Sequence, residues 1–178
     1  MDRRFHVQWL LLPATALAAA PAVATTYFTV EQAQQAMLPG QALAPLAITL
    51  TPAQAKAVEQ ASGVRVRERA LKVWRAANGG WFYLDQVLGK HEFITYALAL
   101  DAHGAVTGLE ILDYRETYGG AVRNPKWRAQ FSGKRHGAPL KLDADIANLS
   151  GATLSSAHIA DGVRRLLATH ALVVAPAR

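Results

Sequence analysis

The sequence predicts an α+β domain: an antiparallel meander sheet packed by a C-terminal helix and preceded by an N-terminal helical lead-in. Three observations lead to this fold class. Apolar side chains alternate with a period of two through the stretch that begins at Val64. Short turn signals separate four such stretches, the clearest being Asn78-Gly79-Gly80. The apolar pattern then takes the helical period over residues 154–172.

Residues 1–24 are predicted to be a cleavable signal peptide. Arg3 and Arg4 give a positive start, residues 9–20 are apolar, and Ala22-Val23-Ala24 is a cleavage pattern. An uncleaved anchor helix is the alternative, although the apolar run is short for a membrane span. We therefore expect export to a bacterial periplasm, with the protein either free there or associated with the membrane.

Residues 25–63 are expected to form the helical lead-in. One helix is predicted over 29–37, with Thr29 as its N-cap. A second is predicted to begin at Thr51-Pro52 and to end at Gly63, since threonine caps helices and proline suits the first helical position. The apolar stretch 41–50 between them is expected to be a loop packed on the body.

Residues 64–178 are expected to form the main domain. Three strands are predicted after the Asn78-Gly79-Gly80 turn, over 81–88, 93–101 and 105–114. The second is apolar throughout, which predicts burial on both faces. A short helix over 124–131 and an irregular segment or edge strand over 134–142 follow. The last helix carries one apolar stripe that must cover the sheet, formed by Ile159, Val163, Leu166 and Leu167.

The composition bounds the function. The chain has 178 residues, 19 Lys and Arg, 13 Asp and Glu, and a formal net charge of +6. The basic residues are scattered and form no known nucleic-acid motif, so we expect no nucleic-acid partner. The absence of cysteine excludes disulfides, thiolate metal sites and cysteine nucleophiles. Arg65, Arg67, Arg69 and Lys72 form either a basic docking edge or, by default, a solvated strand face.

The segment Ser150–Ser156 lies at the predicted start of the last helix. A helix N-terminus carries unpaired N–H groups and a positive dipole end, which favour a phosphate. Gly151 and Ala152 are small enough to let an anion approach the backbone. The plainer interpretation is a local N-cap, because Ser and Thr are favoured there in any case.

A second segment reads Glu116-Thr117-Tyr118-Gly119-Gly120 and is followed by Trp127, Gln130-Phe131 and Gly133-Lys134. Together with Ser150–Ser155, it resembles the periplasmic FMN-binding domain family. That family includes the C subunit of the sodium-pumping NADH:quinone reductase, the G subunit of the Rnf complex and stand-alone exported flavoproteins. The two segments resemble the family's E-T-x-G turn with its Q-F-x-G-K continuation and its S/T-G-A-T/S-x-S/T attachment motif.

The resemblance implies that FMN is held covalently by a phosphoester on Thr153. A Mg-dependent flavin transferase would install it from FAD and release AMP. The implied partners are this transferase and a redox protein such as a cytochrome or a membrane oxidoreductase. The chain would then be an electron carrier without a catalytic residue or a metal of its own. The other implied cofactor-binding residues are Ser150, Gly151, Ala152, Leu154, Ser155, Ser156, Glu116, Thr117, Tyr118 and Gly119.

Roles are expected for four of these side chains. Ser155 and Ser156 are expected to donate hydrogen bonds to the phosphate. Glu116 lacks a partner nucleophile, so it is expected to face the flavin or to cap its turn rather than to act as a base. Tyr118, where the membrane-complex members have proline, either stacks on the flavin or is a turn residue covering the sheet.

The sequence departs from the family pattern at Ala147, where the family usually has aspartate. Asp143 and Asp145 lie nearby but out of register. This departure supports an alternative function, a non-flavinylated periplasmic binding or assembly module of the same fold.

Overall fold

A computed structural model describes residues 25–177 and contains one six-stranded sheet. The predicted signal peptide lies outside the described residues. The strand order is β1-β6-β5-β4-β3-β2, and every neighbouring pair is antiparallel. The strands are β1 (Thr25–Thr26), β2 (Leu43–Thr49), β3 (Ala70–Ala76), β4 (Trp81–Leu88), β5 (Phe93–Leu100) and β6 (Val106–Tyr114). The α+β class and the meander are confirmed.

The turns that define the meander form as their residue types require. The Asn78 side chain accepts a hydrogen bond from the Gly80 N–H at 2.9 Å, which closes the β3–β4 hairpin. Asp101 does the same in the β5–β6 connection, accepting from His103 and Ala105. Gly104 ends that connection with a φ of +78°, the left-handed conformation that glycine adopts without strain.

The prediction of a loop over residues 41–50 is wrong, because residues 43–49 form the edge strand β2. Its seven residues pair with β3, from Leu43 opposite Ala76 to Thr49 opposite Ala70. Pro45 lies within the strand, where it can donate no ladder hydrogen bond, and such a residue is tolerated at a sheet edge. The lead-in therefore contributes a strand to the main sheet as well as helices.

The two lead-in helices are α1 (Val30–Met37) and α2 (Pro52–Ser62), both close to their predicted bounds. Each begins with a capping box, in which two side chains accept hydrogen bonds from each other's backbone N–H groups. The pair is Thr29 and Gln32 in α1, and Thr51 and Gln54 in α2. Gly63 ends α2 in the left-handed conformation. Both caps were predictable from sequence because their hydrogen bonds are local.

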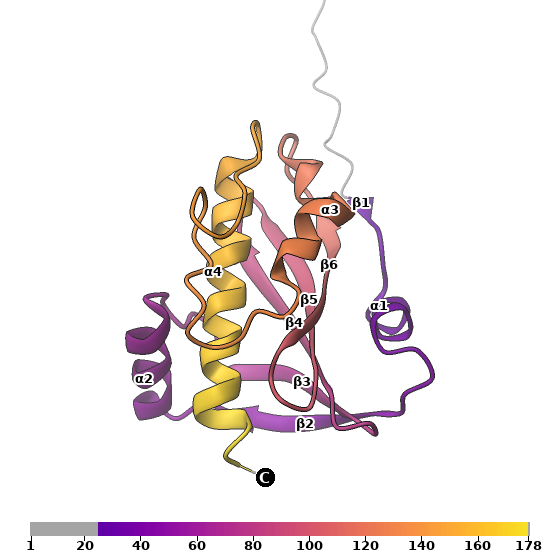
Figure 1. Cartoon of the computed structure of the whole chain (residues 1–178), viewed down its shortest axis with the longest axis vertical. Helices are drawn as coiled ribbons and strands as arrows, with labels where there is room; N and C mark the ends of the chain where they lie inside the picture. The colour runs from indigo at the N-terminus through magenta and orange to yellow at the C-terminus, as the bar shows by residue number, and fades with distance from the viewer. Residues whose placement is uncertain (1–24, 178) are drawn as a thin grey trace, which may run out of the picture.

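Helix α4 (Thr153–Thr169) packs across one face of the sheet, with α2 beside its C-terminal half (Figure 1). A π-helical turn, His170–Val174, continues it. The predicted apolar stripe of α4 is buried against Tyr83, Tyr96 and Leu98 of the sheet. The opposite face of the same strands packs under α1 through Phe82, Ala97 and Ala99. Strand β5 is therefore buried on both faces, as its continuous apolar sequence predicts.

The chain between β6 and α4 has little regular structure. It contains a 3-10 turn at Gly120–Arg123, the one-turn helix α3 at Pro125–Arg128 and a second 3-10 turn at Ala129–Phe131. Residues 134–142 form no strand, and their one bridge joins Leu142 to Ile146. None of the helices within residues 25–177 has the length and apolar character needed to cross a bilayer.

Candidate functional site

The two sequence segments that carry the family resemblance meet at one pocket of about 400 Å³. Helix α4 begins on one side of it, and the turn after β6 lies on the other. The β4–β5 turn closes the third side and was not singled out by sequence. The lining residues are Lys90, His91, Glu116, Thr117, Tyr118, Gly151, Ala152, Thr153, Leu154 and Ser155.

The N-terminus of α4 opens into this pocket without a side-chain cap. The N-cap residue is Ala152, which has no polar side chain, and Thr153 is the first helical residue with its side chain exposed. The plain N-cap interpretation of this segment is therefore wrong. The first N–H groups of a helix have no intrahelical acceptor, so those of Thr153 and its neighbours are available to a ligand in the pocket.

Gly151 leaves room for that occupant. Its φ is +78°, and a β-carbon built on it would meet no heavy atom within 4 Å. The space beside the backbone is therefore open, and a side chain at this position would be conformationally strained. An anion can approach the start of α4 from this side.

The three serines of the attachment segment have different positions. Ser155 is buried and lines the pocket, whereas Ser150 is exposed and does not line it. Ser156 is fully buried, and its hydroxyl donates to the Ala152 and Thr153 carbonyls at 3.0 Å each. The structure thus does not bring Ser156 to the pocket. Continuing the apolar stripe of α4 back one turn from Ile159 leads to Ser155 and Ser156, a signal that could have predicted their burial.

Tyr114, which sequence reasoning missed, joins the two motif segments. Its hydroxyl donates to the Tyr118 carbonyl at 2.5 Å and lies 3.0 Å from the Ser155 hydroxyl. Because Tyr114 donates its hydroxyl proton to the Tyr118 carbonyl, the Ser155 hydroxyl must donate to the Tyr114 oxygen. Ser155 then has no proton left to donate to a phosphate. Burial raises the pKa of Tyr114, and the nearby Glu116 charge adds to this effect, so the phenol stays protonated.

Gly119 makes the contact between the segments possible. A β-carbon there would lie 2.3 Å from the Tyr114 hydroxyl and 3.0 Å from the Ser155 hydroxyl. Its φ of +95° is also one that glycine alone adopts readily. The glycine of the E-T-x-G turn is therefore a packing requirement at the junction with α4.

Glu116 clamps the β4–β5 turn. Its Oε1 accepts hydrogen bonds from the His91 N–H at 2.6 Å and the Glu92 N–H at 3.1 Å. Partial burial acts to raise the pKa of Glu116, but these donors and the Lys90 N–H outweigh it and lower the pKa. The group is an ionised turn clamp, which matches the expected capping role, and it is poorly suited to take up a proton.

Two large apolar side chains remain exposed at the pocket. Tyr118 is 83% exposed and Leu154 is 49% exposed, although both line the pocket. The alternative in which Tyr118 covers the sheet is therefore wrong. Exposed apolar groups on both sides of a pocket indicate a surface that a ligand can cover.

The Q-F-x-G-K continuation does not line the pocket but fixes the loop that leads to it. Gln130 accepts from the Ala147 N–H at 2.7 Å, and the Trp127 indole N–H donates to the Ala147 carbonyl at 2.7 Å. Phe131 is fully buried in the core beneath them. The position at which the family usually has aspartate is thus held by its main chain.

The Lys134 ammonium completes this loop through Asp145, at 3.0 Å. The Asp145 carboxylate also accepts from the Leu140 and Lys141 N–H groups. Burial opposes the effect of these donors, yet the pKa of Asp145 is lowered. Asp145 is committed to the loop and does not take the place of the carboxylate missing at Ala147.

These features define an α+β domain with a pocket for an anionic, partly aromatic ligand at the start of its closing helix. FMN fits the donor set: backbone N–H groups suit its phosphate, and exposed apolar side chains suit its ring. The volume falls within the range of about 300–1,000 Å³ typical of ligand pockets.

The model of the FMN-binding domain family matches residues 89–168, which include every residue of both motif segments. This part of the chain is similar to that family. No curated protein matches the chain.

Proposed function

We propose that the chain is an exported electron-transfer flavoprotein that carries FMN covalently through a phosphoester on Thr153. The observation that carries the proposal is the exposed Thr153 side chain at the uncapped start of α4, inside the pocket that both motif segments line. A phosphate attached there would meet the first N–H groups of the helix and its positive dipole end. Bound FMN supplies one- and two-electron exchange. The N-terminal sequence pattern supports export.

Attachment would be a phosphoryl-group transfer. The Thr153 oxygen attacks the FMN-side phosphorus of FAD, a new P–O bond forms and the pyrophosphate P–O bond breaks. AMP leaves, and the hydroxyl proton passes to a base on a Mg-dependent transferase. The exposure of Thr153 supports this step, because a separate enzyme must reach the side chain.

The remaining pocket residues would bind the flavin without chemistry of their own. Tyr118 and Leu154 offer apolar surface to the isoalloxazine ring, and Lys90 adds a positive charge at the third side of the pocket. Glu116 keeps the β4–β5 turn in place beneath it. An electron carrier requires this positioning and no catalytic acid or base.

The test is the intact mass of the chain produced together with a flavin transferase. We expect an increment equal to FMN minus one water, its loss in Thr153→Val, and its retention in Thr153→Ser, which keeps a hydroxyl. Thr107→Val is the matched control, because it removes an exposed threonine that does not line the pocket and should leave the increment unchanged. A bare polypeptide mass for the exported protein, or an increment that survives Thr153→Val, would contradict the proposal.

Ala147 favours a second candidate, the non-flavinylated binding or assembly module. Its methyl group stands where the family usually has a carboxylate, and neither Asp143 nor Asp145 lines the pocket. The two functions differ in colour after acid precipitation. A yellow pellet supports covalent FMN, whereas a colourless pellet from cells that contain the transferase supports the module.

A further inference from the structure

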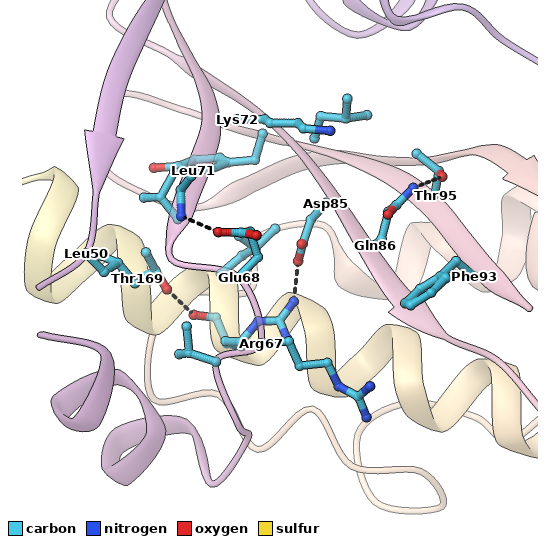
Figure 2. Close-up of a pocket in the computed structure, with 16 residues that line it drawn as sticks. Leu50, Arg67, Glu68, Leu71, Lys72, Asp85, Gln86, Phe93, Thr95 and Thr169 are labelled. Carbon is cyan, nitrogen blue, oxygen red and sulfur yellow. Dashed lines mark hydrogen bonds and ion pairs between the residues drawn. The ribbon is translucent and has the colours of Figure 1, made fainter. Parts of the chain in front are cut away.

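A second hollow, of about 540 Å³, lies where β3 and β4 separate (Figure 2). Four residue pairs join these two strands, from Lys72 opposite Leu84 to Arg75 opposite Trp81. Beyond Leu84, β4 continues to Leu88 with β5 as its partner. The segment 66–70, which leads into β3, forms the other wall of the hollow. We call this hollow the β3–β4 groove.

Arg165 of α4 forms the floor of the β3–β4 groove and holds its walls apart. One guanidinium nitrogen donates to Asp85 of β4 at 2.5 Å, and another donates to the Arg65 carbonyl at 3.3 Å. Tyr96 donates to the same Asp85 oxygen at 2.8 Å. Burial is the largest single influence and acts to lower the pKa of Arg165, but the charges and hydrogen bonds of Asp85 and Tyr96 together outweigh it and raise the pKa. An ion pair between α4 and β4 therefore lies at the floor of the groove and neutralises the Asp85 charge there.

The rim of the groove is basic. Arg67 and Lys72 line it, and Arg65 and Arg69 are exposed on the same extended segment. None of the ion pairs within residues 25–177 involves any of these four side chains. The one carboxylate of this segment, Glu68, accepts from the Ala70 N–H, and its pKa is lowered chiefly by backbone hydrogen bonds. Four cations against one anion favour an acidic occupant.

The groove also offers apolar surface and main-chain hydrogen bonds. Phe93, the first residue of β5, lines the groove with 49% of its surface exposed. The Gly89 N–H donates to the Glu92 carbonyl across the β4–β5 hairpin. In an antiparallel ladder, successive residues of a strand direct their N–H and C=O groups alternately toward and away from the partner strand. Gln86 is three residues from Gly89, so its N–H and C=O point away from β5. That edge faces the gap left by β3. An extended peptide can pair with such an edge.

We propose that the β3–β4 groove binds an extended acidic segment of a partner protein. Its carboxylates would meet Arg67 and Lys72, an apolar side chain would cover Phe93, and its main chain would pair with Gln86. A bilayer surface fits less well, because the apolar group lies inside a concave site. Lys90 and His91 line the flavin pocket and Phe93 lines the groove. A docked redox partner would therefore lie next to the flavin, a consequence that rests on the proposed function.

The test measures binding of a fluorescent peptide of alternating glutamate and valine to the full chain at low salt. We expect saturable binding that weakens about tenfold in the double variant Arg67→Glu/Lys72→Glu. The control Lys126→Glu/Arg135→Glu reverses two exposed cations outside the groove and should change the affinity less than about twofold. Phe93→Ala should also weaken binding without a charge change, and bound peptide should slow amide exchange at Gln86.

Three results would overturn the proposal. The first is the absence of saturable peptide binding, and the second is an equal loss of peptide affinity in the groove and control variants. The third is a charge reversal that weakens binding of the chain to vesicles that contain phosphatidylglycerol but leaves peptide binding unchanged. The Thr153→Val chain should bind the peptide as the unchanged chain does. Failure of flavin attachment therefore leaves the docking result intact, and failure of docking leaves the attachment result intact.

Discussion

Replacing Gly119 by alanine tests whether the junction between the E-T-x-G turn and α4 is as tight as the structure indicates. The new β-carbon would lie 2.3 Å from the Tyr114 hydroxyl and 3.0 Å from the Ser155 hydroxyl. Neither distance is compatible with the present positions of these groups. The variant must therefore displace the Tyr114 hydroxyl, which now bonds both the Tyr118 carbonyl and Ser155.

The expected loss of stability has two parts. A left-handed φ, here +95°, costs alanine about 1–2 kcal/mol relative to glycine. Leaving the buried Ser155 hydroxyl without its partner costs about 1–3 kcal/mol. Together they predict a decrease of about 2–5 kcal/mol in the free energy of unfolding, a large share of the about 5–15 kcal/mol typical of a domain.

The assay is urea denaturation of Gly119→Ala beside Gly120→Ala. The neighbouring glycine is the matched control, because a β-carbon there would meet nothing within 4 Å. At an unchanged slope, the expected loss lowers the urea midpoint of Gly119→Ala by about 1–2 M. The control should stay close to the unchanged chain. Equal midpoints for the two variants would refute the account of this junction.

Two further predictions concern the contacts that position the site. Gly162→Ala places a β-carbon 2.5 Å from the Tyr96 hydroxyl and 2.7 Å from Val87 Cγ1. The overpacking should lower the free energy of unfolding by about 1–3 kcal/mol and lower the melting temperature. An unchanged melting temperature would contradict this prediction. Glu116 has a lowered pKa in the folded chain, so its stabilising effect is full above the ordinary glutamate value and is lost as the pH falls through the folded value. The unfolding free energies of the unchanged chain and Glu116→Gln should therefore differ at pH 7 and converge below about pH 4. A difference that stays constant in a pH series would argue against the clamp.

Local patterns predicted the parts of the fold that depend on local hydrogen bonds. The Thr29 cap, the Thr51 cap and the Asn78 turn each depend on atoms a few residues apart. Strand β2 was missed because its ladder partners lie in β3, which is distant in the sequence. Edge strands depend on a distant neighbour, and composition does not specify that neighbour.

The same distinction applies to the site. The Thr153 and Glu116 segments were predictable as motifs, and the structure brings them to one pocket. Tyr114 was missed because it ends a strand and contacts Ser155, 41 positions away. The Asp85–Arg165 pair, 80 positions apart, was missed for the same reason. Periodicity can place a side chain on a buried face, but it does not identify the partner there.

The contacts of the motif residues explain why segments separated along the chain form one signature. Gln130 and Trp127 hold the Ala147 main chain, which fixes the loop before α4. Tyr114 then ties the start of α4 to the turn after β6. The side chains of Glu116, Tyr114 and Ser155 are thus used in holding the walls of the pocket together. The exposed Thr153 hydroxyl and the first N–H groups of α4 beside it are available to a ligand. Under the proposed function, Thr153 is the one point at which the cofactor would be attached.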